Sequence, residues 1–345
     1  MPIVQAPMAG GLNTPVLAST VSNNGGVGSF GFAYSQPKTI DKDLEITKRL
    51  TKGPINCNFF VFQPVSLPPK GIQFDAIQAL KALPILDGTE INFPVEPFYP
   101  NIDDQLEVIW KHRPEILTFH FGLPEKEVFE KALSMGISVG VTATNISEAM
   151  AIKEAGAAFI VAQGIEAGGH RGNFAANEAD EELPLLVLLK RLSTEVEIPL
   201  VAAGGVMNGS DVGECIEKGA IAAQLGTAFL CCDEAGTGKT YRRFLLNESS
   251  RGTRFTKAFS GRLARGIDNL FIKLMEQKEI LPFPVQNMLT SSLRKIAVDI
   301  DEGEYQSLWA GSAFEKIRAL PASELMEALR FELDLYNDSP KRQNG

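Results

Sequence analysis

One short segment holds the densest group of residues that could do chemistry. Residues 161–172 read VAQGIEAGGHRG and include Gln163, Gly168, Gly169 and His170. Repeated glycines let the backbone approach a flat ligand closely and free its amide groups to bind it. A histidine there can donate to an anion or remove a proton, since its unperturbed pKa is about 6.5. The segment predicts a ligand site with His170 as the reactive side chain. The plainer alternative is a flexible loop whose histidine bonds only to backbone.

Two further segments offer groups that could bind a phosphate. In barrel enzymes the loops after the last two strands usually hold the phosphate, helped by the positive end of the following helix. We expect bare backbone amides from a Gly-Gly pair, and a hydroxyl from a threonine that follows a later glycine. The residues are Gly204 and Gly205 in the first segment, and Gln224, Leu225, Gly226 and Thr227 in the second.

The first strand also ends in residues that suit a flat ligand. Pro7, Met8 and Ala9 lie in the run QAPMAGG, where main-chain groups and the Met8 side chain could pack on the face of a flat ring. A strand that ends in a Pro/Gly turn explains the run equally well. Asn58, at the end of another predicted strand, could bond a cofactor carbonyl, although an isolated asparagine is ordinarily a turn residue.

Two familiar motifs fail on their context. Residues 26–31, GVGSFG, satisfy G-x-G-x-x-G, but a dinucleotide fingerprint follows a strand and opens a helix, which is the reverse of the order predicted here. Residues 236–240, GTGKT, suggest a phosphate-binding P-loop, yet Asp233 stands where that motif needs its first glycine. The three histidines have no metal-ligand spacing and the cysteines do not cluster around them, so we expect no metal site.

A repeating unit organises the first two thirds of the chain and positions these segments. An amphipathic helical segment ends in glycine, which relieves left-handed strain there, and a short apolar run follows. Runs that are apolar throughout suit strands buried on both faces of a parallel sheet. Eight such runs favour an α/β fold of the closed (β/α)8 TIM-barrel type over an open doubly wound sheet. They are residues 2–8, 27–32, 55–61, 115–122, 137–142, 157–163, 199–206 and 220–230.

Other stretches break this rhythm and predict a second domain. Residues 62–101 are rich in proline, with one helical run near 76–83, and the segments 233–283 and beyond 311 show helices and loops without strand rhythm. We expect them to form a smaller, mainly helical capping domain over the barrel mouth. The predicted barrel comprises residues 1–61, 102–232 and 284–311, the capping domain 62–101, 233–283 and 312–338, and a frayed tail 339–345.

The composition and net charge of the chain limit the kinds of partner that it can bind. The chain is 44% hydrophobic and 22% charged, as in globular proteins, and its net charge of −9 argues against nucleic acid or an anionic membrane as a partner. It shows neither a signal peptide nor an apolar stretch near the roughly 20 residues that span a bilayer. The four cysteines form no C-x-x-C pair, which favours a reducing compartment. We expect a soluble, cytoplasmic protein; these patterns predict no oligomeric state.

The segments described above resemble the nitronate monooxygenases, formerly called 2-nitropropane dioxygenases, which are FMN-dependent barrel proteins. The likeness runs from residue 2 to about residue 311, and the string QGIEAGGHRG is quite specific. The resemblance implies that FMN is bound by Asn58, Gln163, Gly168, Gly204 and residues 224–227. The residue patterns described above add Pro7, Met8, Ala9, Gly169 and Gly205 to the predicted cofactor site. It also implies that His170 is the catalytic histidine.

The resemblance further implies an activity. Such enzymes denitrify alkyl nitronates oxidatively, with propionate 3-nitronate as the natural, toxic substrate. The nitronate reduces the flavin, plausibly by one electron, and O2 completes the oxidation to a carbonyl compound and nitrogen oxides. The expected partners are therefore a small nitronate and O2. His170 would hold the anionic nitronate and, for a neutral nitroalkane, could take its α-proton.

Two alternatives stay open. An FMN-dependent enoyl-acyl-carrier-protein reductase shares the Gly-Gly-His loop and would consume NAD(P)H, although residues 260–266 and 290–295 look more like the monooxygenases. A non-catalytic flavin-binding barrel is the other. The family usually carries a short segment before its first strand, and here the chain opens almost directly on that strand. Two explanations stay open: the N-terminal end of the barrel is less completely covered than in the family, or the native protein starts upstream of Met1.

Overall fold

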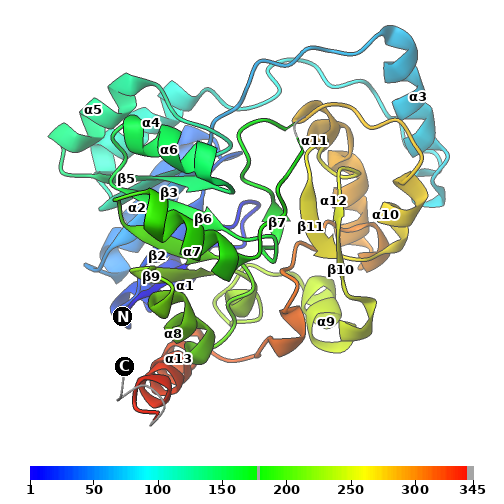
Figure 1. The fold of residues 1–345 in the computed structure, drawn as a ribbon. Helices are drawn as coiled ribbons and strands as arrows, with labels where there is room; N and C mark the ends of the chain where they lie inside the picture. Colours follow the sequence, from blue (N-terminus) through cyan, green and yellow to red (C-terminus); the bar gives the residue numbers. More distant parts are fainter. Residues whose placement is uncertain (177–178, 340–345) are drawn as a thin grey trace.

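The computed structural model describes residues 1–176 and 179–339. Eight parallel strands form one sheet in the order β1-β9-β8-β6-β5-β4-β3-β2. A bridge between Val4 and Val27 brings β1 beside β2, so the sheet nearly closes on itself. This is the predicted TIM barrel (Figure 1). Its strands are β1 (Ile3–Gln5), β2 (Gly28–Gly31), β3 (Ile55–Phe60), β4 (Ile116–His120), β5 (Ser138–Ala143), β6 (Phe159–Gln163), β8 (Leu200–Ala203) and β9 (Ala222–Leu225).

Helices follow the strands and cover the outside of the barrel. The glycines predicted to end them adopt the left-handed conformation, with φ of +72° at Gly136 and +96° at Gly219. Asn145 and Asn208 cap the starts of two helices, each accepting a hydrogen bond from a backbone amide of the first turn. The barrel helices are α1 (Pro15–Asn23), α2 (Pro37–Leu50), α4 (Ile102–His112), α5 (Lys126–Ser134), α6 (Ile146–Glu154), α7 (Leu185–Glu195) and α8 (Gly209–Glu217).

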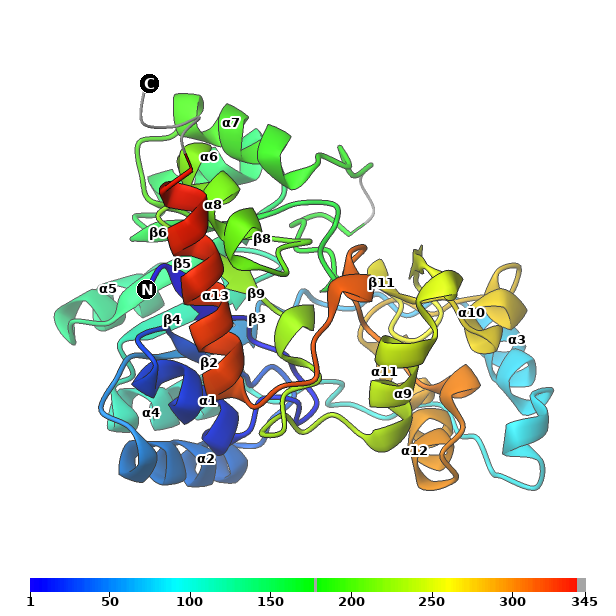
Figure 2. The ribbon, with the colours of Figure 1, turned by 90° about the horizontal axis from the view of Figure 1, so that it is seen from below.

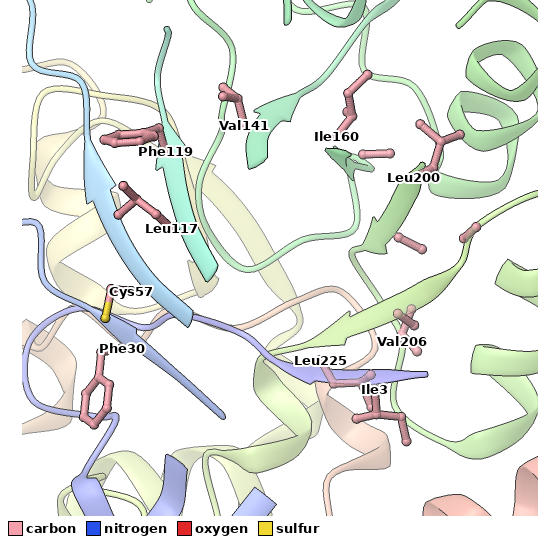
Figure 3. Close-up of a cluster of buried hydrophobic side chains, with 14 of the residues drawn as sticks. Ile3, Phe30, Cys57, Leu117, Phe119, Val141, Ile160, Leu200, Val206 and Leu225 are labelled. Carbon is pink, nitrogen blue, oxygen red and sulfur yellow. The ribbon is translucent and has the colours of Figure 1, made fainter. Parts of the chain in front are cut away.

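The main core lies between these strands and helices. Ile3, Phe30, Cys57, Ile160 and Leu225 are among its buried side chains (Figure 3). Because successive strand residues point to opposite faces, their neighbours point into the barrel. A small apolar cluster fills part of that interior, beside polar residues from β2 to β4 that bond to one another. The barrel therefore presents polar groups, rather than an apolar plug, toward its C-terminal mouth.

A second layer lies beside the barrel and has its own apolar core. It is mainly helical, as predicted, and the helical run expected near residues 76–83 is the end of α3 and the turn after it (Figure 1). Its larger elements are α3 (Lys70–Lys81), α9 (Lys239–Asn247), α10 (Leu270–Met275), α11 (Val285–Leu289) and α12 (Ser291–Asp299). Its short 3-10 turns are η1 (Pro84–Leu86), η3 (Ser249–Arg251) and η4 (Gly303–Tyr305), whereas η2 (Thr227–Phe229) and η5 (Phe314–Lys316) lie nearer the barrel.

The expectation that residues 233–283 contain no strands is wrong. β10 (Thr253–Thr256) and β11 (Ala264–Ile267) pair antiparallel, and β11 also pairs with β7 (Gly169–His170) from the Gly-rich loop. These strands are short, and β10 and β11 are rich in polar residues or glycine, so they lack the apolar runs of the barrel strands. The small sheet ties the predicted reactive loop to the second layer.

Two segments lie elsewhere than expected. α13 (Ala322–Asn337), placed in the capping domain by the sequence, packs on α8 and α1 and contributes Leu325 and Leu329 to the main core (Figure 2). Conversely, α11 and α12, assigned to the barrel, pack in the second core with α3 and α10. Both segments are amphipathic, and an apolar stripe alone does not say which core it faces. The predicted tail from 340 onward falls outside the described residues.

Within the part of the chain that the structure describes, no helix is both long enough and apolar enough to cross a membrane. All four cysteines are free and buried.

Candidate active site

A cavity of about 770 Å³ opens at the C-terminal ends of the barrel strands and reaches the second layer. Its volume is that of a small-molecule site, for which roughly 300–1,000 Å³ is usual. The structure brings almost all of the sequence-predicted site residues to its wall. These are Pro7, Met8, Ala9, Asn58, Gln163, Gly168, Gly169, His170, Gly204, Gly205, Gln224, Gly226 and Thr227.

Leu225 is the exception. Its side chain is fully buried in the main core, facing the helices. The strand pleat explains this, because Gln224 points to the cavity and the next residue must point the other way. The Leu225 side chain therefore does not line the cavity, and only the backbone of this residue is left to contact a ligand.

Gly168 and Gly169 hold the reactive loop close to the second layer. Gly169 has a φ of +75° and pairs with Arg265 of β11. A side chain at Gly168 would meet the backbone of Ala310 and Gly311 at 2.5 Å. Only glycine fits this approach, so the repeated glycines serve to pack the loop as well as to open space for a ligand.

His170 stands in an aromatic chamber of that cavity. Four rings surround its imidazole, with centroid separations of 5.6 to 6.0 Å, from Phe60, Phe121, Phe283 and Trp309. Burial lowers the pKa of His170 to about 3, and the nearby charges of His120, Arg262 and Arg294 act in the same direction. The imidazole is therefore neutral at neutral pH.

Ser260 sets which nitrogen of His170 carries the proton. The Ser260 Oγ atom lies 2.8 Å from His170 Nε2 and 3.1 Å from the carbonyl oxygen of Arg262. That carbonyl can only accept, so the single hydroxyl hydrogen goes to it and Nε2 donates to Ser260. This assigns the hydrogen to Nε2 and leaves Nδ1 with the lone pair that can take up a proton.

Side chains beneath the loop fix its backbone. The Gln163 amide donates to the His170 carbonyl at 3.0 Å and accepts from the Gly172 amide at 2.8 Å. Arg171, fully buried, donates to the carbonyls of Gln163 and Gly164 and forms a 2.6 Å ion pair with Asp180. Burial alone would raise the pKa of Asp180, but the bonds and charge of Arg171 hold it below its usual range. The loop is thus a braced structure rather than a flexible one.

A second histidine that the sequence did not single out lies under the loop. His120 Nε2 lies 3.2 Å from the His170 carbonyl oxygen, and its Nδ1 lies 3.0 Å from Thr142 Oγ1. Burial, with help from the charge of Arg262, lowers its pKa to about 3. His120 acts as a neutral support for the loop and also lines the cavity.

The glycines after β8 and β9 form a cradle of unused amides. Gly204 and Gly205 have φ of +127° and +70°. Among the residues that the structure describes, the amide hydrogens of Gly204, Gly205 and Gly226 donate to no backbone or side-chain acceptor, although all three line the cavity. Gly226 also precedes the short helix η2, whose first residue is Thr227. Such an arrangement suits an anionic phosphate.

The residues of this cavity fit a flavin mononucleotide. The bare amides suit a phosphate, and the remaining cavity wall offers Met8, Asn58 and Gln224 to a flat ring with a polar edge. The Asn58 side-chain amide donates one hydrogen to Thr118 Oγ1, and the side-chain oxygen of Asn58 remains available to a ligand. Thr227 Oγ1 accepts from the Gly311 amide at 3.0 Å, which leaves its hydroxyl hydrogen free to donate. The residues present fit the group that the sequence predicted.

The cavity also contains residues that the motif search missed. Except for Phe60, which ends β3, they come from loops and from the second layer, so no strand-end pattern marks them. The rejected GTGKT segment lies at the rim through Lys239 and Thr240. The others used below are Tyr34, Phe60, Asn287, Arg294 and Trp309.

Comparisons with known proteins agree with this geometry. The model of a family described as "Nitronate monooxygenase" matches residues 1–332. A nitronate monooxygenase of Paraburkholderia phytofirmans is 38% identical over 96% of this chain and 92% of its own length. A probable nitronate monooxygenase of Bacillus subtilis is 33% identical, over 92% and 91% respectively.

Solved structures show the same relationship. A nitroalkane oxidase from Streptomyces ansochromogenes superimposes with a TM-score of 0.91 at 36% identity, covering 98% of this chain and 96% of that one. FabK from Thermotoga maritima superimposes with a TM-score of 0.74 at 26% identity, over 96% and 92% respectively.

Proposed function

Because this chain belongs to the nitronate monooxygenase family, we propose that it binds FMN and uses O2 to oxidise alkyl nitronates, with propionate 3-nitronate as its natural substrate. Members of this family are flavin-dependent oxidoreductases, and so is this enzyme. The observation that carries the finer proposal is the position of His170, which shares one cavity with the bare amides of Gly204, Gly205 and Gly226. We further propose a cytoplasmic location, which suits four free, buried cysteines.

In this proposal, the backbone amides of Gly204, Gly205 and Gly226 hold the phosphate, together with the Thr227 hydroxyl. Asn58, Gln163 and Gln224 supply amides to the polar edge of the ring, and the segment of Pro7, Met8 and Ala9 packs against it. Gly168 and Gly169 keep the loop close. When bound, FMN supplies the electron acceptor that removes electrons from the nitronate and passes them to O2.

His170 handles the charge of the substrate. Its Nε2 is committed to Ser260, so Nδ1 is the atom that takes up a proton. For a neutral nitroalkane, Nδ1 accepts the α-proton. For a nitronate, the anion favours the protonated imidazole, which then holds it. The surrounding rings exclude water, and this strengthens the interaction.

An oxygen electrode tests the proposal. Yellow, purified protein should consume O2 with propionate 3-nitronate at the same rate with and without NADPH. The enoyl reductase alternative predicts the opposite, namely no nitronate-dependent uptake and brisk NAD(P)H consumption with an enoyl thioester. A colourless protein that takes up no FMN would instead support a non-catalytic barrel.

A further inference from the structure

Arg294 is a cavity-lining cation that lacks a carboxylate partner. It lies on α12, and no ion pair among the described residues includes it, whereas Arg171 has Asp180. One of its terminal nitrogens, Nη2, donates to the Asn287 side-chain oxygen at 3.0 Å and to the Asn287 carbonyl. Its Nε is buried and has no hydrogen-bond partner among the described residues. A buried guanidinium that no anion compensates is costly, so a ligand anion would stabilise it.

Tyr34 supplies a second unused donor in the same cavity. Its hydroxyl is buried and has no hydrogen-bond partner within the described residues. Burial raises the pKa of Tyr34 far above its usual value, with Arg294 and Arg262 acting in the opposite direction, so the hydroxyl keeps its hydrogen. Tyr34 therefore offers an unused hydrogen-bond donor to the cavity that Arg294 also lines.

Both groups belong to the chamber of His170. The Phe60 ring contacts both Tyr34 and His170, with its centroid 5.5 Å from that of Tyr34 and 6.0 Å from that of His170. The charge of Arg294 acts on both Tyr34 and His170. The pair therefore lies at the reactive end of the cavity, whereas the amide cradle comes from the loops after β8 and β9.

We propose that Arg294 and Tyr34 bind a carboxylate on the substrate, so that the enzyme selects nitronates that carry a carboxylate at the far end of a short alkyl chain. A planar carboxylate can accept from the guanidinium edge and from the phenol together. Asn287 orients the guanidinium for this contact. The inference rests on the proposed nitronate oxidation, and it assigns the residues that recognise the substrate rather than those that react.

The test compares two nitronates that differ in the distal group. Propionate 3-nitronate carries the carboxylate, and propyl 1-nitronate carries a methyl group in its place. In Arg294→Gln, kcat/KM for propionate 3-nitronate should fall by about tenfold to a hundredfold, since bonds to charged groups are strong. The value for propyl 1-nitronate should fall by a much smaller factor, because Arg294 acts on that substrate only through its charge near His170. Tyr34→Phe removes one hydroxyl that has no partner within the described residues, so it should fold normally and show the same selective loss, about threefold to tenfold.

Lys278→Gln is the matched control, because it removes one positive charge from an exposed position in the second layer. This variant should leave kcat/KM unchanged for both nitronates. An equal loss for both nitronates in Arg294→Gln and Tyr34→Phe would overturn the inference. So would loss of FMN from either variant, since the pair would then serve the cofactor.

A binding measurement separates this inference from the proposed function. Butyrate carries the carboxylate but no nitronate, and it should raise the melting temperature of the wild-type holoprotein but of neither variant. If neither nitronate supports O2 uptake by the wild type, the proposed oxidation fails, while the butyrate result still tests the carboxylate site. Equal stabilisation of wild type and Arg294→Gln by butyrate would overturn it.

Discussion

His170 Nε2 and Ser260 Oγ lie 2.8 Å apart although 90 positions separate them in the chain. His170 belongs to β7, and Ser260 lies between β10 and β11 of the same small sheet. The second layer therefore orients the imidazole that we propose to react with the substrate. This makes Ser260 a positioning residue for His170.

Replacing Ser260 should misorient the imidazole without emptying the site. Ser260→Ala removes the acceptor of Nε2–H, so kcat for nitronate oxidation should fall by about threefold to tenfold, the range for one hydrogen bond. Ser260→Thr keeps the hydroxyl and should restore most of the rate. FMN content should match wild type in both, whereas Ser260→Ala should also lower the melting temperature, because its hydroxyl is buried and bonds to the backbone of Arg262. Equal rates in Ala and Thr variants would show that the hydroxyl does not position His170.

The glycine cradle predicts a selective loss of cofactor. In Gly205→Ala, the added Cβ would lie 3.0 Å from the Glu166 Cβ at a φ of +70°, so the loop must move and FMN binding should weaken by at least about tenfold. Gly252→Ala carries similar strain at a φ of +65° with nothing within 4 Å, away from the cavity. Each variant should lose about 1 kcal/mol of stability. A fluorescence titration with FMN should separate them, and equal affinities would refute a role for the cradle.

The buried ion pair under the loop should matter far more than a surface pair nearby. Asp180→Ala leaves the Arg171 charge buried and unpaired, so the free energy of unfolding should fall by about 3–5 kcal/mol. Glu181 pairs with Arg191 at 3.4 Å, both half-exposed, and Glu181→Ala should cost less than about 1 kcal/mol. Urea unfolding of both variants gives the comparison. Similar losses would mean that the loop does not depend on Asp180.

Acid should destabilise the fold through its buried histidines. Burial lowers the pKa of His120 and of His170 to about 3, whereas an unfolded histidine has about 6.5. The unfolded chain then binds more protons between these values, so the stability contributed by each neutral histidine is full above about pH 6.5 and declines toward pH 3. At pH 5 the loss is roughly 2 kcal/mol per histidine. Melting curves at pH 7 and pH 5 should show a smaller drop in His120→Gln than in wild type; identical drops would contradict the assignment.

Most of the barrel and about half of the candidate site could be predicted from the sequence. Short apolar runs marked the barrel strands, because strands buried on both faces need such runs, and a glycine before four of them marked the end of the preceding helix. Residues such as Gly204 and His170 could be found because barrel sites gather at strand ends. The alternation along β9 further shows that Leu225, unlike Gln224, turns its side chain away from the cavity.

The other half of the site could not be read this way. Ser260 meets His170, and Arg294 reaches the cavity, only because the second layer packs against the barrel. Tyr34 lies in the loop after β2, and no local spacing connects it with the other two. The apolar face of α13 packs in the barrel core and not in the second core, and the sequence of the helix alone does not determine which core it joins. The strands β10 and β11 were too short and polar to stand out.

The most direct test of the account is the His170→Ala variant in the oxygen electrode, with its FMN content measured in the same sample. The account predicts a yellow protein with a full complement of FMN whose uptake of O2 with propionate 3-nitronate is slower by at least about a hundredfold, as for loss of a general acid–base group. Unchanged turnover by the flavin-loaded variant would contradict it.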